Sequence, residues 1–172
     1  MFRLLAIVLI LYGSVGYALK LCQEMRTRIR HIAQMKEIFG LFMSEISYSR
    51  ITLPEACYQV AVRAAEPYKT ALEKIYRKTF EKSGVCFPDI WKMQMEQCLR
   101  EIPVKKEEEA IFLEFGNQLG FSDLEMQVGV LHKNIAQLDE LYKKTKGALE
   151  NQEKVITGVG ILGGLMLVII LI

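Results

Sequence analysis

The chain has 172 residues, of which 51% are hydrophobic and 24% are charged, and this length leaves little material for a catalytic domain. Its 22 basic and 20 acidic residues give a net charge of +2, which argues against a nucleic-acid-binding protein held by bulk electrostatics. Apart from Arg3, every charged residue lies between Lys20 and Lys154, and this pattern of two apolar ends around a charged middle excludes an ordinary soluble enzyme and a disordered tail protein.

The first predicted element is an apolar segment, residues 4–21, which we expect to cross a membrane as a helix. Residues 1–18 also resemble a signal peptide, with a positive start, an apolar run and small residues near Ala18. Basic residues cluster on the inner side of both apolar ends, however, and the outer flanks carry almost none. The positive-inside rule therefore favours an uncleaved span and a cytoplasmic middle. An exported helical adaptor protein with a C-terminal membrane anchor stays open as the alternative.

Residues 22–154 form the predicted cytoplasmic helical domain, since they show helical periodicity and no strand alternation. One helix is predicted from the membrane to about Ser49, because apolar residues step by three and four along it: Ile32, Met35, Phe39, Phe42 and Ile46. Arg26, Arg28 and Arg30 precede this stripe. They are interpreted as topology determinants or contacts to the anionic headgroups of the lipid bilayer, with docking onto a partner as the second interpretation.

A new helix is predicted to start at Thr52. Thr52 can cap the helix, Pro54 lies in the first turn where its missing N–H costs little, and Glu55 completes a capping box. The helix should end near Ala65, because the residue before Pro67 avoids the helical region. A second short helix is expected from there to Ser83-Gly84, and a third from Pro88 to Pro103.

The next predicted helix begins with an acidic face and stops at Gly120. Its carboxylates are interpreted as solvent-facing charges, and an acidic docking patch for a basic partner surface is the alternative. The residues are Glu107, Glu108, Glu109 and Glu114.

Residues 122–125 are a second capping box and predict the start of a long helix that runs into the last apolar segment, residues 155–172. This segment is predicted to be a transmembrane helix, because 18 residues without a charge, at about 1.5 Å each, cover the hydrocarbon thickness of a bilayer. The glycines of this segment have two interpretations: they offer a small-residue face for packing against another helix, or they are scattered without a role in a lipid-facing helix. They are Gly160, Gly163 and Gly164.

These elements predict an all-α fold. It is a cytoplasmic bundle of about six helices, in which two long antiparallel helices continue into N- and C-terminal transmembrane helices. The apolar stripes are interpreted as intramolecular core. Nearer the membrane, association with a second copy or with another membrane protein is equally compatible with them.

The sequence contains no motif that carries catalysis. It lacks a phosphate-binding loop and a G-x-S-x-G elbow, and no close Cys or His pair suggests a metal site. Its four cysteines, without C-x-x-C spacing, suit reduced thiols in the cytoplasm: Cys22, Cys57, Cys86 and Cys98. We therefore expect no enzyme, no cofactor, no metal and no small-molecule substrate.

Four segments, in this order, carry a resemblance to a known family. They are Gly16-Tyr17 before an Arg-rich helix, residues 45–48 before residues 52–56, Phe115-Gly-Asn-Gln-Leu-Gly120 followed by Ser122-Asp123, and the apolar end 160–172. Over its whole length the chain resembles the stage III sporulation protein AB family of endospore-forming bacteria. The stretch from Gly84 to Val104 shows little family signal.

The resemblance implies a two-pass protein of the mother-cell membrane around the forespore, required for endospore formation. The family's helical domain is similar to the cytoplasmic domain of the type II secretion F platform protein. By that likeness the protein is expected to be a platform subunit of a secretion-like channel between mother cell and forespore. Its implied partners are the secretion-type ATPase of the same operon, stage III sporulation protein AA, and other channel subunits.

The motif residues are interpreted first as structural. Phe115 and Leu119 should pack the helix that carries them, and Gly116 should permit close approach of another helix. The turn before the last helix should be shaped by Gly120, Ser122 and Asp123. A docking corner at this turn is the alternative.

Overall fold

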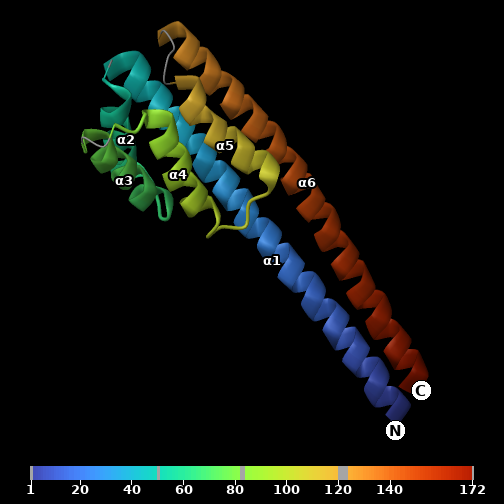
Figure 1. The fold of residues 1–172 in the computed structure, drawn as a ribbon. Helices are drawn as coiled ribbons and strands as arrows, with labels where there is room; N and C mark the ends of the chain where they lie inside the picture. The colour runs from blue at the N-terminus through green and yellow to red at the C-terminus, as the bar shows by residue number, and fades with distance from the viewer. Residues whose placement is uncertain (1, 50, 82–83, 120–123, 172) are drawn as a thin grey trace. The chain divides into compact units, whose positions relative to one another are not determined.

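The computed structural model describes residues 2–49, 51–81, 84–119 and 124–171, without the side chains of several residues near the two ends (Figure 1). The described residues form six α-helices and a short π-helical turn and include no strand, which confirms the all-α class. The chain divides into two compact units, described separately below. The central unit is Arg30–Tyr142, and the end unit comprises the chain on either side of it.

The end unit is built from parts of two long helices, α1 (Phe2–Ser44) and α6 (Leu124–Leu171). Within this unit the two helices lie side by side (Figure 1), and the Arg26 guanidinium donates to Oε1 of Glu153 at 2.6 Å. Cys22 and Leu149 are buried.

Among the described residues, none of the helices combines the length and the apolar character needed to cross a lipid bilayer. The membrane spans at residues 4–21 and 155–172 stay predictions from the sequence.

The central unit packs short helices against one another in chain order. They are α2 (Leu53–Arg63), α3 (Tyr68–Phe80), α4 (Phe87–Leu99) and α5 (Lys106–Leu119), and each contacts the next. The C-terminal part of α1 and the N-terminal part of α6 complete the unit. The apolar stripe predicted on the first helix is buried in its core: Ile32, Met35, Phe39, Phe42 and Ile46.

Proline and capping signals account for the helix boundaries around α2. Thr52 has extended backbone, and the Glu55 carboxylate accepts its backbone N–H at 3.1 Å and its hydroxyl at 2.8 Å. Pro54 occupies the first turn, where a helix needs no donor. The break before Pro67 is confirmed, because α2 ends at Arg63 and α3 begins at Tyr68.

The first helix differs from the prediction at its end. Regular α-helix stops at Ser44, and Glu45–Ser49 form a π-helical turn. The nearly buried Glu45 carboxylate accepts the Ser49 hydroxyl at 3.1 Å and pairs with the Arg63 guanidinium at 2.8 Å. A wider turn at this point lets a charged side chain stay inside the fold with its partners.

Candidate functional site

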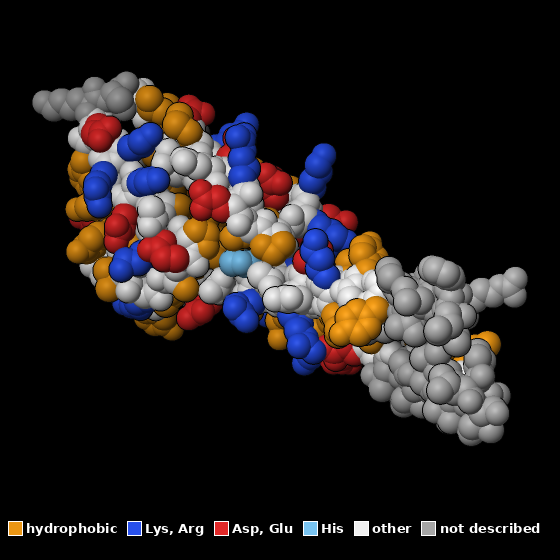
Figure 2. All heavy atoms as spheres, turned by 90° about the horizontal axis from the view of Figure 1, so that it is seen from below, with side chains coloured by type: hydrophobic (Ala, Val, Ile, Leu, Met, Phe, Trp, Pro, Cys, Tyr) orange, Lys and Arg blue, Asp and Glu red, His pale blue; other side chains and the backbone are white. Residues whose placement is uncertain are grey.

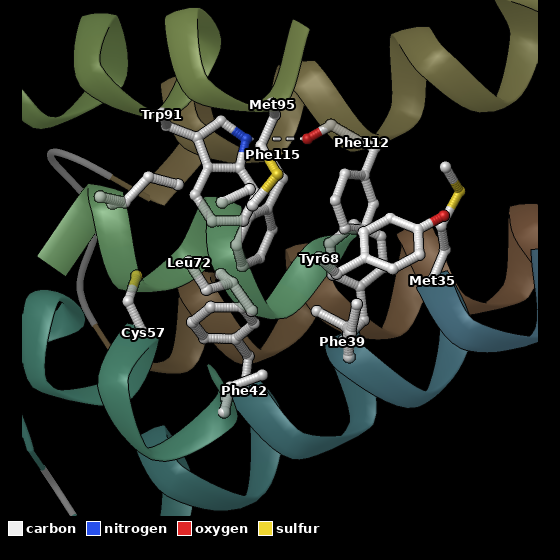
Figure 3. Close-up of a cluster of buried hydrophobic side chains, with 14 of the residues drawn as sticks. Met35, Phe39, Phe42, Cys57, Tyr68, Leu72, Trp91, Met95, Phe112 and Phe115 are labelled. Carbon is white, nitrogen blue, oxygen red and sulfur yellow. Dashed lines mark hydrogen bonds between the residues drawn. The ribbon is translucent and has the colours of Figure 1, made fainter. Parts of the chain in front are cut away.

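The family-like motif meets α4 in a cluster of aromatic rings (Figure 3). Trp91 is fully buried, and its indole N–H donates to the main-chain carbonyl of Phe112 at 2.9 Å. Ring centroids of Phe115 lie 4.9 Å from Trp91 and 4.7 Å from Phe39. These distances are those of favourable aromatic pairs, so Phe115 holds α5 against both α1 and α4.

Gly116 of α5 lies directly against the Trp91 side chain of α4. A Cβ placed on this glycine would lie 2.5 Å from Cδ1 and 2.8 Å from Cβ of Trp91. Only hydrogen fits there, so the glycine sets the spacing of the two helices. Leu119 is the last residue of α5, and Gly120, Ser122 and Asp123 lie outside the described residues.

The acidic face of α5 is only partly exposed. Glu107 and Glu114 are exposed and Glu109 is half-buried. The prediction that all four carboxylates face solvent is wrong for Glu108, which is fully buried. Glu108 lies three residues after Lys105 and accepts its backbone N–H at 2.7 Å, so helix capping explains its burial.

The predicted basic docking residues differ in pairing and in exposure. Arg26 pairs with Glu153, and the hydrogen bond to that carboxylate raises the pKa of the guanidinium. Arg28 is half-buried, whereas Arg30 is exposed. Figure 2 shows acidic and basic side chains intermixed on the visible face of the described residues. That face therefore carries no field of a single sign.

The cysteines differ sharply in accessibility. Cys22, Cys57 and Cys98 are buried, and Cys86, which precedes α4, is exposed. Burial raises the pKa of the Cys57 thiol above its usual range and that of Cys98 to about 12, so both thiols are unreactive at neutral pH. Among the described residues, no three His, Cys, Asp or Glu side chains come together in a way that could hold a metal ion.

Two further polar side chains, one half-buried and one fully buried, lie near the aromatic cluster. The ring of His31 stands edge-on to Tyr68 at 6.0 Å between centroids, and burial lowers the pKa of the imidazole. Desolvation raises the pKa of the Tyr68 hydroxyl, which has no hydrogen-bond partner among the described residues. Tyr68 packs as part of the core, whereas His31 is half-buried beside it.

One feature that was not predicted from the sequence is a cavity of about 270 Å³ between α3 and α4, which is open to solvent. Its polar lining is drawn from both helices and their flanks: Glu66, Thr70, Lys74, Gln94, Gln97, Cys98 and Glu101. The signal that could have revealed it is the polar pair Gln94 and Gln97, which share one face of α4, followed just beyond the helix end by Glu101.

Comparison with known proteins gives one consistent result. The family model described as stage III sporulation protein AB matches residues 3–172. The chain is 25% identical over 171 residues to stage III sporulation protein AB of Bacillus subtilis (strain 168), covering 99% of each protein. A solved structure of a stage III sporulation protein AB is similar with a TM-score of 0.64 and 22% identity, over 72% of this chain and 97% of that one. The structural likeness supports the fold alone.

Proposed function

This chain belongs to the stage III sporulation protein AB family, a family of sporulation proteins, and from that premise we propose that it is a platform subunit of a secretion-like channel. In this proposal residues 4–21 and 155–172 anchor it in the mother-cell membrane around the forespore. The domain between them faces the mother-cell cytoplasm and engages the secretion-type ATPase of the same operon, with other channel subunits alongside.

The observation that carries the proposal is the family match over residues 3–172, which leaves no large part of the chain for a different activity. The central unit adds support of a second kind. Its conspicuous motif, Phe115-Gly116, is occupied in packing against Trp91. A rigid helical unit that presents charges on its surface suits a protein that binds other proteins.

The exposed carboxylates of α5 are the surface that we assign to the ATPase. Glu107 and Glu114 are seven residues apart, so they lie on one helical face, and both are exposed. Such charges at the edge of an interface act mainly on the rate of association and on specificity. Contact with a basic ATPase surface should therefore weaken as salt concentration rises.

The docking surface is tested by co-purification of the tagged ATPase with the full-length chain from sporulating cells. A Glu107→Lys, Glu114→Lys variant should recover about tenfold less ATPase at low salt, because it places two cations where two carboxylates stood. The matched control reverses the charge at two exposed carboxylates on other helices, Glu37→Lys and Glu140→Lys. It should recover as much ATPase as the unmodified chain. Equal recovery from both variants would remove α5 from the interface, and no recovery from the unmodified chain would remove the platform role.

The location of the central unit is tested through its exposed thiol. A maleimide that cannot cross membranes should label Cys86 only after cells are opened, because the proposal places this residue in the cytoplasm. Cys86→Ala should abolish labelling of the native protein, since the other three thiols are buried. Labelling of Cys86 in intact cells would instead support the exported adaptor with a C-terminal anchor.

A further inference from the structure

The cavity between α3 and α4 has an acidic end. Glu66 and Glu101 line it there, close to Pro67 at the start of α3. Because α3 ends at Phe80 and α4 begins at Phe87, the short connection makes the two helices antiparallel. The beginning of α3 therefore meets the end of α4, which brings the two carboxylates to the same end.

The opposite end of the cavity is formed by Lys74 and Gln94. Each lies about two helical turns from the acidic end, on α3 and α4 respectively. Cys98 lies on the floor between the ends. The charges of Glu101 and Glu66 raise the pKa of its thiol and that of Lys74 lowers it, in addition to the larger effect of burial. All three charged groups therefore lie around the same surface hollow, and all three side chains are exposed to solvent.

Three polar side chains of this cavity make no hydrogen bond or ion pair within the described part of the chain. The Gln94 side chain is 5% exposed, lines the cavity and makes no hydrogen bond within the described part of the chain. Lys74 and Glu101 form no ion pair with any described residue, and Glu66 accepts only the backbone N–H of Thr70, at 3.3 Å. The Gln94 residue is thus nearly buried, and its amide, which has no protein partner, opens into the hollow where a ligand can bind it.

The dimensions of the cavity favour a side chain over a free small molecule. Its volume of about 270 Å³ is below the range usual for small-molecule sites, which also enclose most of the ligand. The walls offer carboxylate and amide oxygens beside the apolar surfaces of Pro67 and Ala71. An arginine meets both requirements, because its stem is apolar and its guanidinium carries five donors arranged to bind carboxylates.

We propose that this cavity receives an arginine side chain presented by a partner protein. The guanidinium lies between the carboxylates of Glu66 and Glu101, and the Gln94 amide hydrogen-bonds to the partner's main chain. Lys74 at the other end repels a second cation and donates to a carboxylate or carbonyl oxygen beside the arginine. The site lies on α3 and α4, so it is independent of the α5 surface and of the membrane arrangement.

The proposal is tested with N-acetyl-L-arginine amide, which represents an arginine within a chain, and with the neutral isostere N-acetyl-L-citrulline amide. Saturation-transfer NMR detects millimolar binding of each probe to the full-length protein. The arginine probe should bind about tenfold more tightly than the citrulline probe, because only the guanidinium forms charge-assisted hydrogen bonds. Equal binding of the two probes would refute the proposal. So would tighter binding of free L-arginine than of the capped amide, since that outcome indicates a free amino-acid site.

Variants then place the binding in the cavity. Glu66→Gln with Glu101→Gln should reduce arginine binding at least about tenfold, while glutamine keeps an acceptor for the Thr70 N–H and so preserves the fold. Glu73→Gln removes a carboxylate that pairs with Arg77 on the same helix, outside the cavity, and should leave binding unchanged. Unchanged binding in the double variant would overturn the assignment. Neither result affects the α5 docking test, so the two proposals can fail separately.

Discussion

Replacing Phe39 by alanine should reduce the free energy of unfolding of the central unit by about 3–5 kcal/mol. Phe39 is fully buried on α1, and its ring centroid lies 5.0 Å from that of Phe112 and 4.7 Å from that of Phe115. The substitution removes the contacts by which α1 holds α5, and it leaves a cavity that the two rings on α5 cannot easily fill. Urea unfolding of the full-length chain, followed by the fluorescence of its single tryptophan, Trp91, measures the change.

The same substitution at Phe80 is the control. Phe80 is 62% exposed and contacts the ring of Tyr76 at 5.0 Å, near the end of α3. Phe80→Ala should therefore change the free energy of unfolding by less than about 1 kcal/mol. If the two variants unfolded at the same urea concentration, the core would not be organised around Phe39.

The helix boundaries were predictable because they depend on local chemistry. Pro67 interrupts a helix regardless of the residues around it. At the start of α2, the Glu55 carboxylate accepts the backbone N–H and the hydroxyl of Thr52, so this cap is made by residues close in sequence. The stripe through Phe39 and Phe42 was predictable for a similar reason, since a helix with one apolar face must bury it.

Features that depend on tertiary contacts were not predictable from the sequence. Glu108 occurs within a run of charged residues, which is typical of a solvent-exposed surface. It is nevertheless buried, at the position where it caps α5. Glu45 looks like an ordinary helical glutamate, but Arg63, 18 residues away, makes its burial possible. The cavity was missed because Glu66 and Gln94 come together only when α3 and α4 pack.

The division between packing residues and surface residues has a consequence for function. Phe115 and Gly116, which belong to the strongest family-like motif, are buried against α4. The residues assigned to partners, Glu107 and Glu114 on α5, are the exposed members of the same helix. One helix can thus hold the fold with one face and offer charges with the other, so mutations on the two faces should have separable effects on stability and on binding.

Gly116→Ala should destabilise the protein by about 1–3 kcal/mol, even though alanine is the better helix former. The new methyl group would lie 2.5 Å from Cδ1 and 2.6 Å from Cγ of Trp91, so α4 and α5 must move apart and the rings around Phe115 must repack. The control is Gly129→Ala in α6, where nothing lies within 4 Å of the added Cβ. That variant should gain about 0.5–1 kcal/mol, because alanine restricts the unfolded chain and favours the helix. Urea unfolding of both variants, monitored by Trp91 fluorescence, should therefore give changes of opposite sign in the free energy of unfolding. A Gly116→Ala protein as stable as the unmodified chain would show that α4 and α5 do not approach as closely as this geometry requires.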